Sequence, residues 1–77
     1  MNYELAMMAL EGLSRSPLRI TMRPNGVEIT GTGSAFKELA RLCLLLGGEE
    51  SPAGEEFELK PPLHVSRDSA GLRLRRT

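Results

Sequence analysis

The side chains that could do chemistry in this chain are few, and each stands alone. His64 is the only histidine and Cys43 the only cysteine among the 77 residues. A zinc site needs several such ligands, and a single cysteine forms no internal disulfide. Strand-like alternation places His64 on a solvated face beside Arg75, and a helical pattern places Cys43 among leucines, where a thiol behaves as a small apolar group. The sequence therefore predicts a protein that is not an enzyme, with no catalytic residue, metal site or cofactor.

The segment GTGS at residues 31–34 has some likeness to a phosphate-binding loop, because two glycines precede an expected helix. It lacks the third glycine of a dinucleotide fingerprint and the Lys-Ser/Thr pair of a P-loop. The strand before it belongs to an expected hairpin rather than to a parallel unit. The pattern thus favours a plain strand-to-helix connection over an anion site.

Charged residues are balanced in number but separated along the chain. The net charge is zero, yet residues 49–58 hold five glutamates and no cation, and residues 60–77 hold five cations and one aspartate. This separation can steer a protein partner, and the glutamates would complement a basic one such as a nuclease. The residues that we expect to contact a partner are Glu49, Glu50, Glu55, Glu56, Arg73 and Arg75.

An alternative function is that of a small nucleic-acid-binding or regulatory domain. It rests on the arginines of the C-terminal segment, which are Arg67, Arg73, Arg75 and Arg76. Zero net charge argues against it, because neutralising several phosphates usually takes an excess of cations. The three aromatic residues also lie outside the expected polar sheet face, so the stacking surface of nucleic-acid sheet readers is missing.

One stretch, residues 33–46, keeps a helical period and is the element on which the rest should pack. Its expected buried stripe comprises Phe36, Leu39, Ala40, Cys43 and Leu46. Thr32 or Ser34 would cap its start, and Gly47-Gly48 would end it in the left-handed conformation. A second, short helix is expected from Asn2 to Gly12, packed on its own domain or on another subunit, with a mobile tail as the third alternative.

Period-two patterns predict strands on both sides of this helix. Residues 18–22 and 27–29 form a hairpin around Arg23-Pro24-Asn25-Gly26, with the turn either at Asn25-Gly26 or at Pro24-Asn25. Residues 57–59 begin a further alternating block. Residues 63–65 and 72–74 are expected to pair as a second hairpin across the turn at 68–71, with Val65 opposite Leu74.

These elements predict an α+β fold with two layers: an antiparallel sheet of four to five strands, with one central helix packed on one face. Residues 1–77 form a single domain, made of an N-terminal helical segment (1–16) and an αβ core (17–77) with a mobile acidic loop at 47–55. The expected core is Leu18, Ile20, Met22, Val27, Ile29, Phe36, Leu39, Ala40, Cys43, Leu46, Phe57, Leu59, Leu63, Val65, Leu72 and Leu74. So small a core suggests a homodimer, joined by a sheet edge or by the N-terminal segment. No secretory signal or membrane-length apolar run is present, so we expect a soluble, cytoplasmic protein.

The run from Met22 to Thr32 (MRPNGVEITGT), the helix start FKELARL at 36–42 and the later Leu63-His64-Val65 together resemble small bacterial proteins of the immunity protein 32 family. The resemblance covers residues 18–75. It implies a strand, strand, helix, strand arrangement and an association with polymorphic toxin systems, but it carries over no functional residue. The sequence therefore favours a non-enzymatic protein-binding module, of the kind that inhibits a bacterial toxin.

Overall fold

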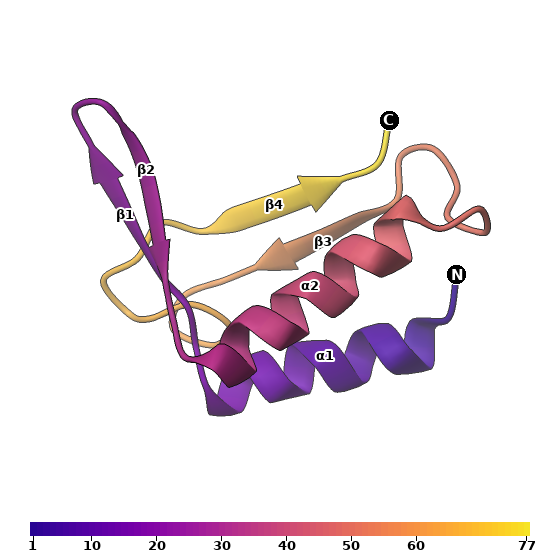
Figure 1. Ribbon diagram of the computed structural model, residues 1–77, viewed down its shortest axis with the longest axis horizontal. Coiled ribbons are helices and arrows are strands. Elements are labelled where there is room, and N and C mark those ends of the chain that lie inside the picture. The colour runs from indigo at the N-terminus through magenta and orange to yellow at the C-terminus, as the bar shows by residue number, and fades with distance from the viewer.

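The computed structural model describes residues 1–77 and contains two helices and four strands (Figure 1). Their bounds are α1 Tyr3–Arg15, β1 Arg19–Arg23, β2 Gly26–Thr30, α2 Gly33–Gly47, β3 Glu56–Leu59 and β4 Leu72–Arg75. β1 pairs with β2 and β3 with β4, each antiparallel and in its own two-stranded sheet. The predicted α+β class is confirmed. The single sheet of four to five strands is wrong, and the helix layer holds two helices instead of one, because the N-terminal helix that was predicted as optional packs on α2.

Helix α1 packs beside α2 along most of its length (Figure 1). Asn2 caps it as predicted, because its side chain accepts a hydrogen bond from the Leu5 N–H. The helix does not end at Gly12 but runs on to Arg15. Gly12 instead lies against the side chain of Glu38 from α2, so the missing Cβ lets the two helices approach closely.

Helix α2 is capped by Thr32, whose hydroxyl accepts from the Ala35 N–H at 3.1 Å. It ends at Gly47-Gly48 as predicted, but Gly48 is extended, with φ of −74°, and not left-handed. Its buried side chains are Ala35, Leu42 and Leu46. Of the predicted stripe, Leu46 is buried and Leu39 partly buried, but Phe36, Ala40 and Cys43 are exposed. The buried face is therefore rotated from the predicted one by about one residue, or about 100° around the helix.

The β1–β2 hairpin projects from the body like an arm, and we call residues 19–30 the arm (Figure 1). Of the two predicted turns, the one at Pro24-Asn25 is present, since Arg23 pairs with Gly26 and Thr21 with Glu28. The foot of the arm is buried through Ile20. Beyond the foot the arm extends past the helices, so its outer half has no neighbour.

The second predicted hairpin is wrong, because β4 pairs with β3 and not with residues 63–65. Phe57 lies opposite Leu74, and Glu56 opposite Arg75. This register buries an aromatic ring and sets acidic against basic side chains, whereas the predicted one would place His64 near Arg75. Val65 is buried, but it forms an isolated parallel bridge with Leu18.

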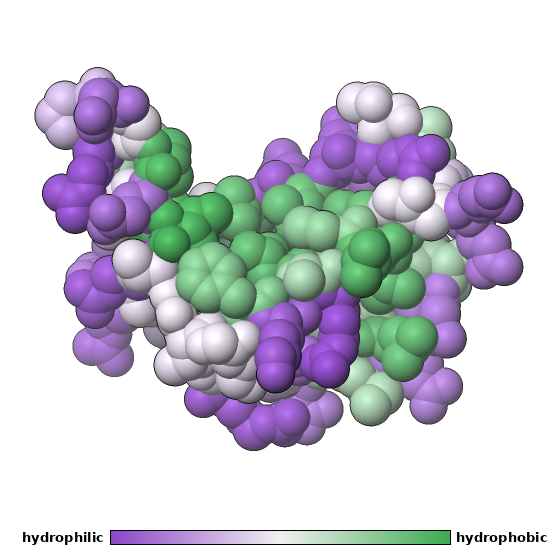
Figure 2. Space-filling view, viewed as in Figure 1, coloured by the Kyte–Doolittle hydropathy of each residue, from purple (hydrophilic) through white to green (hydrophobic).

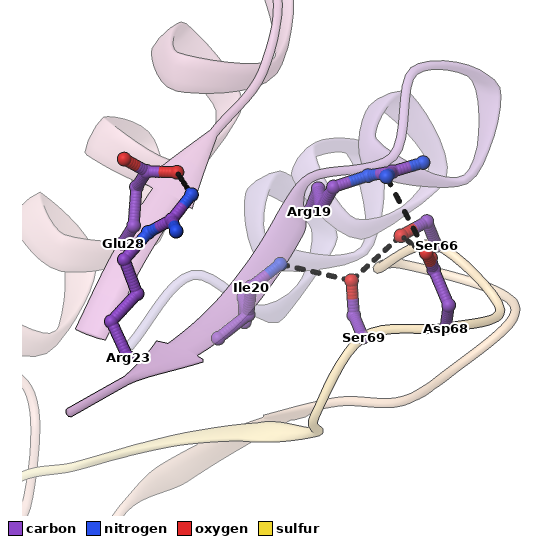
Figure 3. Close-up of polar contacts among 7 residues, drawn as sticks. All are labelled: Arg19, Ile20, Arg23, Glu28, Ser66, Asp68 and Ser69. Carbon is purple, nitrogen blue, oxygen red and sulfur yellow. Dashed lines mark hydrogen bonds and ion pairs between the residues drawn. The ribbon is translucent and has the colours of Figure 1, made fainter. Parts of the chain in front are cut away.

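Residues 64–70 run along the outer edge of β1 and join the two halves of the chain (Figure 3). Leu18 exchanges backbone hydrogen bonds with His64 (3.1 Å) and Ser66 (2.7 Å). Two residues further along β1, the Ile20 N–H donates to the Ser69 hydroxyl at 2.9 Å. In a regular sheet the acceptor would be a backbone carbonyl, but here it is a side chain. The Ser66 and Ser69 hydroxyls hydrogen-bond each other at 2.6 Å.

The core draws on both helices, β1, β3 and Val65. Ten predicted core residues are buried or pack partly buried against it: Leu18, Ile20, Ile29, Leu39, Leu46, Phe57, Leu59, Val65, Leu72 and Leu74. Six are exposed, which corrects the prediction: Met22, Val27, Phe36, Ala40, Cys43 and Leu63. Their places are taken by Ala6, Ala9, Leu13, Ala35 and Leu42.

Replacing Ser69 with Ala should lower the free energy of unfolding by about 1–3 kcal/mol, because the partly buried Ile20 N–H loses its acceptor. Urea denaturation measures the change. Ser14→Ala is the matched control, since that hydroxyl only bonds an exposed carbonyl within α1. Equal stability of Ser69→Ala and the parent protein would contradict the role assigned to this contact.

Candidate protein-binding face

The outer half of the arm carries apolar side chains that nothing covers. Met22 and Val27 are cross-strand partners on the same face as the Ile20–Ile29 pair. Met22 is 67% and Val27 58% exposed, while Ile29 is partly buried at the foot. We call Met22, Val27 and Ile29 the arm patch.

Helix α2 exposes a second group of apolar side chains, which we call the helix patch: Phe36, Ala40 and Cys43. Their spacing puts them on one stripe, next to the buried one. Phe36 is 42% exposed, and its ring reaches the neighbourhood of Gly31 at the foot of β2. Gly31 is needed there, because a Cβ would come within 2.8 Å of the buried Leu18 side chain.

The two patches lie on one side of the molecule. Figure 2 shows a hydrophobic band along α2 that continues up the inner side of the arm, with a hollow between the arm and the body. Leu72 and Leu74 of β4, both only partly buried, add to the apolar surface of the fold. We call the arm patch and the helix patch together the apolar face. Exposed apolar surface of this kind is typical of a protein–protein contact site.

Two of the six charged residues predicted to bind a partner, Glu56 and Arg73, pair with each other within the chain. Arg73 lies 3.3 Å from Glu56 and 3.9 Å from Glu58. Because β3 and β4 are antiparallel neighbours, the acidic and basic segments of the sequence meet and neutralise each other. The other four predicted residues have no ion pair: Glu49, Glu50, Glu55 and Arg75.

Glu55 and the acidic loop are tied to both ends of the chain. Tyr3 donates its hydroxyl to Glu55 at 2.6 Å, and this hydrogen bond to a carboxylate raises the pKa of Tyr3. The backbone of Gly54 bonds that of Arg76, and the Arg76 guanidinium reaches the Leu46 carbonyl at 2.7 Å, near the negative end of α2. The predicted mobility of residues 47–55 stays a prediction, but their backbone is anchored.

These contacts also bear on the arginines proposed for nucleic acid. Arg73 is engaged by two glutamates and Arg76 by backbone carbonyls. On the arm, Arg23 pairs with Glu28 at 3.0 Å, and Arg19 with Asp68 at 3.4 Å (Figure 3). The pKa of Asp68 is lowered, first by the hydrogen bond from the Ser66 hydroxyl, then by a hydrogen bond from the backbone of Asp68 itself, and then by the positive charge of Arg19. Arg67 and Arg75 have no ion pair, so two of the four arginines stay free, which is few for a site that must neutralise several phosphates.

The side chains that could take part in catalysis or metal binding do not form a cluster. Cys43 is exposed on α2, against the prediction that it is buried, and no cluster of three or more His, Cys, Asp or Glu side chains is close enough to hold a metal ion. His64 is partly buried and accepts a hydrogen bond at Nδ1 from the Lys60 N–H (3.3 Å), so it does not sit beside Arg75 as expected. Sequence reasoning missed Met22, Val27 and Phe36 as surface residues because it assigned every apolar position of the alternating strands, and one stripe of the central helix, to the core.

Acidification should destabilise the protein through His64. Burial, and then the charge of Lys60, lower the pKa of His64 below its ordinary value of 6.5. A histidine with a lowered folded pKa binds protons more readily when unfolded, so stability is full well above pH 6.5 and falls as the pH drops through that value. Urea denaturation at pH 7.5 and 5.5 should show a smaller loss for His64→Gln. An identical loss in both proteins would contradict this assignment.

No helix of the chain combines the length and apolarity needed to cross a bilayer. Comparisons with protein-family models, curated proteins and solved structures found no match to this chain.

Proposed function

We propose that this chain is a non-enzymatic protein-binding module that uses the apolar face, and that it acts as an immunity-type inhibitor of a bacterial toxin. The observation that carries the proposal is the exposure of Met22, Val27 and Phe36, together with the hydrophobic band that Figure 2 shows over α2 and the inner side of the arm. The sequence resemblance to immunity protein 32 supports the choice of partner. The apolar side chains that the core leaves exposed support the choice of a binding role.

The contact would be driven by apolar burial rather than by long-range attraction. Seven ion pairs lie within the chain, and the net charge is zero, so little field extends into solvent. An aromatic ring flanked by aliphatic side chains is the usual composition of an interface centre. The partner should therefore present an apolar surface, with polar groups only at its margin.

Val27→Asp and Phe36→Asp should each reduce recovery of the partner from an extract of the source cells by at least about tenfold, because either places a charge in an apolar contact. Tagged parent and variant proteins are compared by quantitative mass spectrometry. Met7→Asp is the control, since Met7 is 70% exposed on α1, outside the apolar face.

The protein identified in this way is then purified and titrated calorimetrically, where a negative heat-capacity change marks apolar burial. Co-expression should restore growth to cells that the partner poisons. Recovery of no protein that depends on Val27 and Phe36 would contradict the binding proposal. Binding to nucleic acid that weakens steeply with salt would favour the phosphate-binding alternative instead.

A further inference from the structure

The arm patch and the helix patch belong to the same chain, yet neither one covers the other. We propose that, in the absence of another partner, a second copy of this chain covers the apolar face, with the arm patch of each copy packed on the helix patch of the other. This inference rests on the proposed function only in using the same face.

The exposed area of the chain supports a second copy. A compact monomer of 8.4 kDa should expose about 4,600 Å² by the usual scaling with mass. This chain exposes 5224 Å². Its radius of gyration is 12.3 Å, against about 11.5 Å for a compact domain of this length. The excess, roughly 600 Å², shows that this chain leaves more surface uncovered than a compact monomer does, and that surface is available to an interface of ordinary size, roughly 800 Å² per partner.

The geometry fits a two-fold exchange of arms. In an isologous interface each subunit must carry both of the surfaces that touch. The arm supplies one, because Met22 and Val27 extend past the body, and α2 supplies the other through Phe36, Ala40 and Cys43. Related by a two-fold axis, each arm would enter the hollow of the other copy that Figure 2 shows.

The edge of the arm is also open to a neighbour. Leu18 and Ile20 turn their backbone groups outward from β2 and bond residues 64–70. Alternation places the N–H and C=O of Met22 on the same outward edge, where no hydrogen bond meets them. A second copy seated there can therefore satisfy backbone groups as well as cover apolar side chains.

Charge does not oppose the association. The net charge is zero, so two copies do not repel each other at long range. Arg23 and Glu28 pair with each other on the face of the arm opposite Met22 and Val27, so their charges do not oppose a contact through the arm patch. Because partner and second copy would share one face, raising the protein concentration should weaken apparent partner binding.

The first test is sedimentation velocity of the full chain over a wide concentration range. The parent protein should show a monomer–dimer equilibrium, and Val27→Asp or Phe36→Asp should raise its dissociation constant by about 100-fold or more. Leu44→Asp is the matched control: Leu44 is 76% exposed on α2 but lines a groove of about 300 Å³ with Leu5 and Leu45. Urea denaturation of the monomers confirms that each variant is folded.

The second test distinguishes this contact from any other dimer. Val27→Asp and Ala40→Lys should each weaken the homodimer, but their mixture should form a heterodimer, because the arm aspartate of one copy then meets the helix lysine of the other. A parent protein that stays monomeric, a dimer broken by Leu44→Asp alone, or a mixture that fails to associate would each overturn the inference. Partner recovery that still depends on Val27 would leave the proposed function standing.

Discussion

The fold depends on the capture of the outer edge of β1 by residues 64–70. A two-stranded hairpin is marginal alone, and here neither sheet has a third strand. The backbone bonds at Leu18 and the Ser69 hydroxyl on the Ile20 N–H give β1 a second neighbour. They also bring Val65 into the core and turn the chain toward β4. Without this seam the N-terminal and C-terminal hairpins would share only the surface of the helices.

The same seam explains which parts of the fold the sequence could predict. Periodicity within one element was enough for both helix starts, the antiparallel hairpin of the arm and the alternating faces of β3 and β4. It was not enough for pairing between distant segments, because residues 57–59 and 63–65 have equivalent alternation. Which of the two segments pairs with β4 depends on contacts outside the periodic pattern. Glu56 lies opposite Arg75 in the observed register, and the Ser69 hydroxyl occupies the place of a strand carbonyl beside Ile20. A hydrogen bond made by one side chain does not show in the alternation of apolar and polar residues along the sequence.

The candidate site was missed for a related reason. Helix α2 has apolar residues on two adjoining stripes, and hydropathy alone does not say which one faces the sheet. The buried alanines determine which stripe of α2 faces inward. Ala6, Ala9 and Ala35 are buried where the packed elements approach closely, and larger side chains there would not fit. Phe36 and Cys43 are then left outside. The error in the predicted helix stripe and the exposure of the helix patch thus have one cause, a rotation of α2, whereas the arm patch is exposed because the arm projects beyond the body.

Charge, which dominated the sequence pattern, loses its separation on folding. The acidic segment and the basic segment are joined by a twelve-residue connection that lets β3 and β4 lie antiparallel, and Arg73 then contacts Glu56 and Glu58. Exposed pairs of this kind contribute little to stability, but they reduce the charge separation that could have attracted a partner. What the fold leaves unsatisfied is apolar surface. Recognition by this chain is therefore expected to depend on shape and on burial at short range.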